Sequence, residues 1–150
     1  MIVRQLDRDQ CLDIIEKNRL GRLACISVGV PYIVPIHYVH AEDHLYAFSM
    51  PGRKIEALRA DPGAAILVED IDTPQHWRTV MVRGRYEELP DRYGFKRLRD
   101  RAWQLLSRHA VWWEPGAYKP VAPALAFKSE QVFFRISIDE ISGRESIDGD

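Results

Sequence analysis

The sequence lacks a surplus of charge of either sign and has no long apolar stretch. Its 150 residues contain 21 Lys and Arg against 22 Asp and Glu, a net charge of -1. No overall basic field therefore attracts nucleic acid or an anionic membrane. Residues 1–10 lack the apolar core of a signal peptide, and no apolar run approaches the length of a bilayer span. We expect a cytoplasmic protein that binds neither nucleic acid nor membrane.

The sequence is also poor in metal-ligand and nucleophile patterns. Its two cysteines, Cys11 and Cys25, show no CxxC spacing, and we expect both to be small buried side chains. His37 and His40 are three residues apart in a predicted strand, so they point to opposite faces. The other histidines lack zinc-ligand spacing, and no nucleophile-elbow glycine pattern surrounds a serine. We therefore expect no metal site and no Ser-His-Asp hydrolase.

One domain, residues 1–150, is expected, because a chain of this length buries a sufficient core by itself. Apolar residues at helical or alternating spacing predict its elements, and the short links favour antiparallel pairing. This order predicts a mainly β fold with peripheral helices, a small barrel or curled sheet rather than a doubly wound parallel sheet. The predicted elements are a helix from the N-cap Asp9 to Asn18, strands at 21–28 and 32–39 around a turn at 29–31, a strand at 44–48, a helix at 53–60, strands at 64–69 and 79–87 around a polar link at 70–78, a helix at 91–109 and a strand at 131–138.

Two local patterns suggest where a ligand binds. Pro35 lies inside a predicted strand and removes a ladder donor, which indicates an edge or a bulge with free backbone. After the turn at Pro51 and Gly52, Arg53 and Lys54 open a helix, where two cations oppose the helix dipole unless an anion joins them. Ser49 adds a hydroxyl donor just before the turn. A solvated basic turn is the alternative to this anion site.

Five segments carry a family resemblance: GRLACIS, PYIVPIHY, LYAFSMPGRKIEAL, DPGAAILVED and HWRTVMVRGRYEEL. In this order and spacing, from Leu20 to Leu89, the chain resembles the pyridoxamine 5′-phosphate oxidase-like family of flavin-binding split barrels, in the branch that includes nitroimidazole-resistance proteins. The resemblance implies a split β-barrel and a homodimer with FMN in a groove between the subunits. It also implies an oxidoreductase that moves hydride or electrons between a reduced nicotinamide, NAD(P)H, and an unidentified small acceptor.

The resemblance also implies roles for individual residues. Arg53 and Lys54 would pair with the FMN phosphate, helped by Ser49, and an Arg and a Lys at a helix N-terminus suit a dianion on physical grounds as well. No catalytic side chain is expected, because the flavin carries the chemistry. The remaining implied contacts are Thr79 beside Arg78, the backbone of Val34, Pro35, Ile36 and His37 against the isoalloxazine edge, and Phe48 near the ring, for which core packing is the alternative.

Two departures from the family limit what the resemblance implies. Phe48 stands where nitroimidazole-resistance proteins have a His, so the nitroreductase role of that His does not carry over. Arg135 alone stands where vitamin B6 oxidases have an Arg and His pair, which disfavours vitamin B6 synthesis. The rival ligands are deazaflavin F420 and haem, and the rival class is a non-catalytic flavin-binding or sensory module. For the Trp112 and Trp113 loop, packing is favoured over a lid on the flavin.

Overall fold

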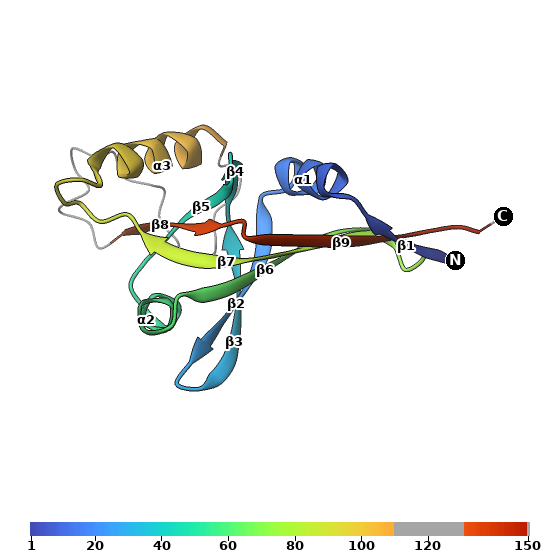
Figure 1. The fold of residues 1–150 in the computed structure, drawn as a ribbon, viewed down its shortest axis with the longest axis horizontal. Coiled ribbons are helices and arrows are strands. Elements are labelled where there is room, and N and C mark those ends of the chain that lie inside the picture. The colour runs from blue at the N-terminus through green and yellow to red at the C-terminus, as the bar shows by residue number, and fades with distance from the viewer. Residues whose placement is uncertain (110–130, 150) are drawn as a thin grey trace.

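The structure, a computed structural model, describes residues 1–109 and 131–149. In these ranges the chain forms one nine-stranded antiparallel sheet of order β3-β2-β6-β7-β8-β5-β4, with β9 paired to β7 and β1 (Figure 1). Three helices pack outside this sheet. The elements are β1 (Ile2–Leu6), α1 (Arg8–Lys17), β2 (Leu20–Ser27), β3 (Val30–His37), β4 (Val39–Ala41), β5 (His44–Ser49), α2 (Arg53–Ala60), β6 (Gly63–Thr73), β7 (His76–Glu88), α3 (Lys96–His109), β8 (Val132–Ser137) and β9 (Glu140–Ile147).

The long strand β7 joins two parts of the sheet. It pairs with β9 as far as Arg83 and with β8 from Tyr86 onward. Gly84 lies at the change of partner, where an added Cβ would come within 1.6 Å of the Ser137 carbonyl oxygen. Only glycine allows the strands to approach this closely, so the sheet curls around this point. The predicted split β-barrel, mainly β with peripheral helices, is confirmed.

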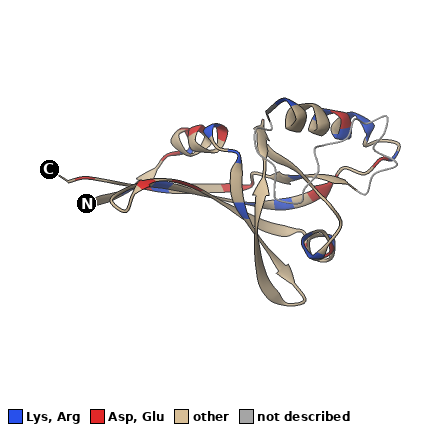
Figure 2. Ribbon diagram, turned by 180° about the vertical axis from the view of Figure 1, so that it is seen from behind, with Lys and Arg blue, Asp and Glu red and all other residues tan. Residues whose placement is uncertain are grey.

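The helices cover the sheet from two sides. Figure 1 shows α1 and α3 above the strands and α2 below them. The main core lies inside the curl, where α1 contributes Ile15 and α2 contributes Ile55 and Leu58. A second core lies under α3, around Phe133 and Leu106. Charged residues of both signs lie along α1 and α3, whereas the lower part of the β2–β3 hairpin has none (Figure 2).

Elements with a strong local pattern form where they were predicted. The helix at Arg53–Ala60 has the predicted bounds, and the β2–β3 hairpin is present. β3 pairs only with β2 among the described strands, so the edge indicated by Pro35 is confirmed. The strands predicted at 44–48 and 131–138 appear as β5 and β8 within about two residues of those bounds.

Other expectations were wrong. Asp7, not Asp9, caps α1: its carboxylate accepts from the Gln10 backbone N–H at 2.8 Å, and the Gln10 side chain accepts from the Asp7 N–H at 2.9 Å. The turn of the first hairpin lies at Val28 and Gly29, both with positive φ, so Val30 already belongs to β3. The strand predicted at 32–39 ends at residue 37, and α3 begins five residues later than expected.

Three strands were not predicted. β1 and β9 pair with each other, and β4 is a short strand beside β5. The expected polar link at 70–78 instead continues β6 and β7 as a hairpin, in which Asp70 pairs with Arg78, Ile71 with Trp77 and Thr73 with His76. The Trp112 and Trp113 loop lies outside the described residues. No helix in the described ranges is long and apolar enough to cross a membrane.

Candidate functional site

The N-terminus of α2 is the centre of the candidate site. Its N-cap is Gly52, which has no side chain, and among the described residues the helix start has no side-chain cap hydrogen bond. The first helical residues, Arg53 and Lys54, are exposed and half-buried respectively. Unsatisfied N–H groups and two cations at one helix end attract an anion, and a phosphate fits this donor set.

Both cations lie over the β2–β3 hairpin. The Arg53 guanidinium carbon is 5.4 Å from the centre of the Tyr32 ring, within the range of a cation–π contact. Tyr32 pairs with Cys25 across the hairpin. Burial raises the pKa of the Cys25 thiol, and the positive charge of Lys54 opposes that rise. Arg53 and Lys54 therefore stand beside the same pair of hairpin residues, and we call Arg53 and Lys54 the cation clamp.

Ser49 is close to the clamp in sequence but has a local partner. It ends β5, and its hydroxyl donates to the backbone oxygen of Met50 at 2.9 Å. To donate to a bound anion, this hydroxyl would have to rotate away from that carbonyl. Phe48, the preceding residue, is half-buried, and its ring centre is 6.0 Å from that of Phe133 in the second core. Phe48 therefore packs at the boundary between that core and the end of β5.

The backbone expected to meet the flavin ring lies on the edge strand β3. Val34 is half-buried and Pro35 exposed, whereas Ile36 and His37 are buried. β3 is in contact with β5, which leads to the clamp. Burial, together with the nearby Arg19, lowers the pKa of His37. An edge strand has backbone groups unused by the ladder, and these suit the polar edge of a flat heterocycle.

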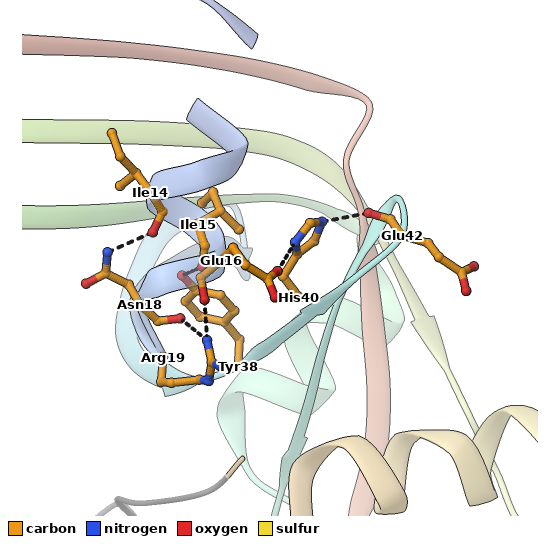
Figure 3. Close-up of polar contacts among 8 residues, drawn as sticks. All are labelled: Ile14, Ile15, Glu16, Asn18, Arg19, Tyr38, His40 and Glu42. Carbon is orange, nitrogen blue, oxygen red and sulfur yellow. Dashed lines mark hydrogen bonds and ion pairs between the residues drawn. The ribbon is translucent and has the colours of Figure 1, made fainter. Parts of the chain in front are cut away.

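The C-terminal end of α1 supports the strands that follow β3 (Figure 3). The hydroxyl of Tyr38, which is fully buried, donates to the Ile15 carbonyl at 2.7 Å. His40 contacts the Glu16 carboxylate through Nδ1 and the Glu42 carbonyl through Nε2, both at 2.6 Å. These contacts satisfy acceptors at the end of α1 and tie it to the start of β4. They hold the residues that follow β3 against α1.

Arg78 and Thr79 do not join the clamp within one chain. Val80 is fully buried in the main core, so Thr79, the residue before it, projects from the opposite, outer face of β7. Cys25 lies in the main core and therefore on the inner face. Ala24, next to Cys25 on β2, pairs with Ala65 on β6, and Ala65 pairs with Arg83 on β7. Arg83 is four residues from Thr79, which corresponds to roughly 13 Å along the strand. Arg78 forms an ion pair with Asp70 at 2.6 Å.

The sequence did not predict two residues that lie beside the candidate site residues in the structure. Tyr32 lies under Arg53, and the pairing of Tyr32 with the clamp could not be read from the strand pattern alone. Arg144 is the direct partner of Thr79 on β9, a strand that was not predicted. In the described residues, no three His, Cys, Asp or Glu side chains converge as a metal site would require.

A curled antiparallel sheet with a cationic helix N-terminus beside an edge strand is the arrangement of a flavin-binding split barrel. The family model described as pyridoxamine 5′-phosphate oxidase matches residues 7–145. The chain belongs to this family. It is 40% identical, over 100% of its length and 99% of the relative's, to a protein of Rhizobium meliloti (strain 1021) described as uncharacterized.

Solved structures agree with this membership. The chain is 48% identical to an FAD-binding protein from Mesorhizobium loti, with a TM-score of 0.80 over 98% of this chain and 100% of that one. A candidate 5-nitroimidazole antibiotic resistance protein from Bacteroides thetaiotaomicron is 20% identical, with a TM-score of 0.71 over 97% of this chain and 89% of that one. At that lower identity the likeness shows the fold alone.

Proposed function

We propose that the protein binds FMN at the cation clamp and acts as an oxidoreductase. The single observation that carries this proposal is the uncapped N-terminus of α2 with Arg53 and Lys54 in its first turn, both beside the β2–β3 hairpin. A phosphate dianion there would accept charge-assisted hydrogen bonds from both side chains and from the backbone. Ser49 would add one donor after rotating its hydroxyl.

The flavin ring would lie along β3, beyond the phosphate. The edge backbone from Val34 to His37 would meet its polar edge, and Phe48 would border it from β5. When bound, the flavin supplies hydride and electron transfer, and the protein binds and orients it. The residues named here position the ring, exclude water and hold the phosphate, so no side chain has to act as an acid or a base.

The site would be completed by a second copy of the chain. The outer face of the sheet carries exposed apolar side chains on neighbouring strands: Ile26 on β2, Ile33 on β3 and Leu67 on β6. Such a face suits burial against a second copy. Thr79 projects from this outer face, away from its own clamp, so it would reach the flavin held by the other protomer, with Arg78 next to it in β7. This supports the homodimer that the family resemblance implies.

The electron donor would be a reduced nicotinamide, and the acceptor an unidentified small molecule. The relative from Mesorhizobium loti is an FAD-binding protein, which makes FAD the main competitor of FMN as ligand. FAD contains the same phosphate next to its ribityl chain, so the clamp by itself accepts either nucleotide. Cys11 and Cys25 are buried free thiols, which supports a reducing, cytoplasmic location.

The visible absorption spectrum of the freshly purified protein tests this function. We expect a flavin spectrum and release of FMN on denaturation, and NADH oxidation in air once FMN is restored. A deazaflavin or haem spectrum would show that the protein binds F420 or haem instead of FMN. Release of FAD would show that the protein binds a flavin, but as FAD rather than FMN. A flavin-loaded protein that oxidises neither NADH nor NADPH would support a non-catalytic binding module.

A further inference from the structure

A surface cavity of about 430 Å³ lies on the outer face of the sheet, where β6, β7 and β9 meet β1. Leu67 and Met81 form an apolar part of its wall, and Thr79, Ser142 and Arg144 supply polar groups. An apolar wall with a few convergent polar groups is the usual composition of a small-molecule site.

Thr79 and Arg144 are direct cross-strand partners in this cavity. Side chains of such partners start roughly 5 Å apart and project from the same face. Arg144 is exposed, and within residues 1–109 and 131–149 its side chain makes no hydrogen bond or ion pair. Its neighbours differ: Glu145 pairs with Arg4, and Arg78 pairs with Asp70. Arg144 is therefore a cation that the described part of the chain leaves available to a ligand.

The cavity cannot serve the clamp of its own chain. The clamp lies beside Cys25 and Tyr32, whose side chains face inward, whereas Thr79 and Arg144 project from the outer face. Thr79 also lies far along β7 from the strand row beside the clamp, so the cavity and the clamp differ in position as well as in face. A flavin that reaches this cavity must therefore be one whose phosphate is held by another protomer.

The charge requirements of a flavin indicate which part of it Arg144 would meet. Arg53 and Lys54 already supply two cations for the phosphate dianion. The ring would lie along β3, which has no Lys or Arg, and whose buried His37 has a lowered pKa and so stays neutral at pH 7. A reduced flavin carries negative charge on its pyrimidine part. The clamp protomer therefore supplies no cation from β3 for that charge.

We propose that Arg144 of one protomer, next to Thr79, contacts the isoalloxazine ring of the flavin held by the clamp of the other protomer and favours its reduced, anionic form. This inference rests on the proposed flavin function and dimer. It adds a residue and a role, because Arg144 would set the reduction potential while the clamp sets phosphate affinity. The site is then incomplete in either protomer alone.

Affinity measurements separate the two roles. We expect Arg144→Gln to weaken FMN and riboflavin alike, each by roughly tenfold, because the ring is common to both ligands. Arg53→Ala should weaken FMN only. The reduced flavin should lose more affinity than the oxidised one, and a further tenfold difference lowers the midpoint potential by about 30 mV. Arg97→Gln, an exposed change on α3, is the matched control and should leave both quantities unchanged.

A mixed dimer tests whether Arg144 acts across the interface. Chains with Arg53→Ala and chains with Arg144→Gln are co-expressed with different tags, and the heterodimer is purified through both. If Arg144 acts in trans, one site of the heterodimer contains both changes and the other contains neither, so half of the sites regain native FMN affinity. If Arg144 acts in cis, each site contains one change and none recovers.

The outcomes distinguish failure of this inference from failure of the function. Unchanged flavin affinity and potential in Arg144→Gln, with a normal clamp phenotype, overturns the inference alone. The same holds if no site recovers in the heterodimer, or if Arg144→Gln only weakens the dimer in light scattering, since the cavity would then receive a partner side chain. If Arg53→Ala binds FMN as the parent does, the proposed phosphate site itself is wrong.

Discussion

The guanidinium group of Arg53 lies over the ring of Tyr32, with 5.4 Å between the guanidinium carbon and the ring centre. This contact places the first residue of α2 over the second strand of the hairpin. It explains how an exposed arginine side chain can be oriented before a ligand arrives, because a cation over an aromatic face has fewer accessible rotamers.

The cation clamp should set the affinity for the phosphate. Loss of a hydrogen bond to a charged group costs about 1.5 to 3 kcal/mol, so Arg53→Ala or Lys54→Ala should weaken FMN binding by roughly ten- to a hundredfold. Riboflavin, which lacks the phosphate, serves as the control ligand and should bind nearly as before. A fluorescence-quenching titration measures both. Parent-like FMN binding in both variants would place the phosphate elsewhere.

Tyr32 should act on FMN through Arg53. Removing the aromatic face with Tyr32→Leu should weaken FMN by roughly two- to fivefold, the size of an exposed cation–π contact. Tyr32→Phe keeps that face and should retain parent affinity. In an Arg53→Ala background, Tyr32→Leu should have no further effect. An equal loss in both backgrounds would mean that Tyr32 contacts the ligand or the core directly.

Flavin affinity should depend on protein concentration. If the site is shared by two chains, dilution below the dimer dissociation constant leaves each half with too few contacts to hold FMN. Titrations at several protein concentrations, run beside light scattering, should show affinity and dimer fraction falling together. A monomer that still binds FMN tightly would exclude the shared site.

Thr79 should contribute a single hydrogen bond to the flavin, with its ring or with a phosphate oxygen. Thr79→Val keeps the β-branched shape and removes the hydroxyl, so FMN affinity should fall by on the order of 1 kcal/mol. The melting temperature of the flavin-free protein should be unchanged or slightly raised, because the side chain starts half-exposed on the outer face. Unchanged affinity would mean that the hydroxyl simply faces water.

Stability should fall in mild acid because two histidines are held neutral. Burial, then Arg19, lowers the pKa of His37; burial, then Arg135, lowers that of His44, with Glu87 and other carboxylates opposing. Below the ordinary value of 6.5 the unfolded chain binds protons that the folded chain does not, so the free energy of unfolding decreases as pH falls toward the lowered folded values.

The measurement is denaturant unfolding of the flavin-free protein between about pH 7 and about pH 5. A His37→Gln, His44→Gln variant should show a shallower loss of stability over this window than the parent, and the difference removes the common contribution of the carboxylates. Identical slopes in the two proteins would show that these histidines titrate alike in the folded and unfolded states.

Local patterns in the sequence located much of the candidate site. The Pro51-Gly52 turn and the apolar spacing after it predict the helix that begins at Arg53, because helix formation depends on near neighbours. The alternation predicts that Thr79 and Val80 lie on opposite faces of their strand, since a strand turns each successive side chain to the opposite face. Pro35 predicts the sheet edge for an equally local reason, the missing backbone donor.

Residues that depend on distant pairing could not be located this way. β9 contains Gly143 and several polar residues, and it becomes a strand only because β7 and β1 pair with it on either side. Arg144 therefore gains a partner in Thr79 only in the folded chain. The closeness of Gly84 to Ser137 has the same origin, because the change of partner along β7 brings those segments together.

The sequence by itself determined most of the elements, the cationic start of α2, the opposite orientation of Thr79 and Val80, and the family to which the chain belongs. Tertiary structure alone decided that Tyr32 lies under Arg53, that β9 brings Arg144 beside Thr79, and that Thr79 projects from the face opposite the clamp. The physical reason is the sequence distance over which the two kinds of interaction act. Propensity and alternation act over a few residues, whereas the curl of the sheet brings together strands from opposite ends of the chain.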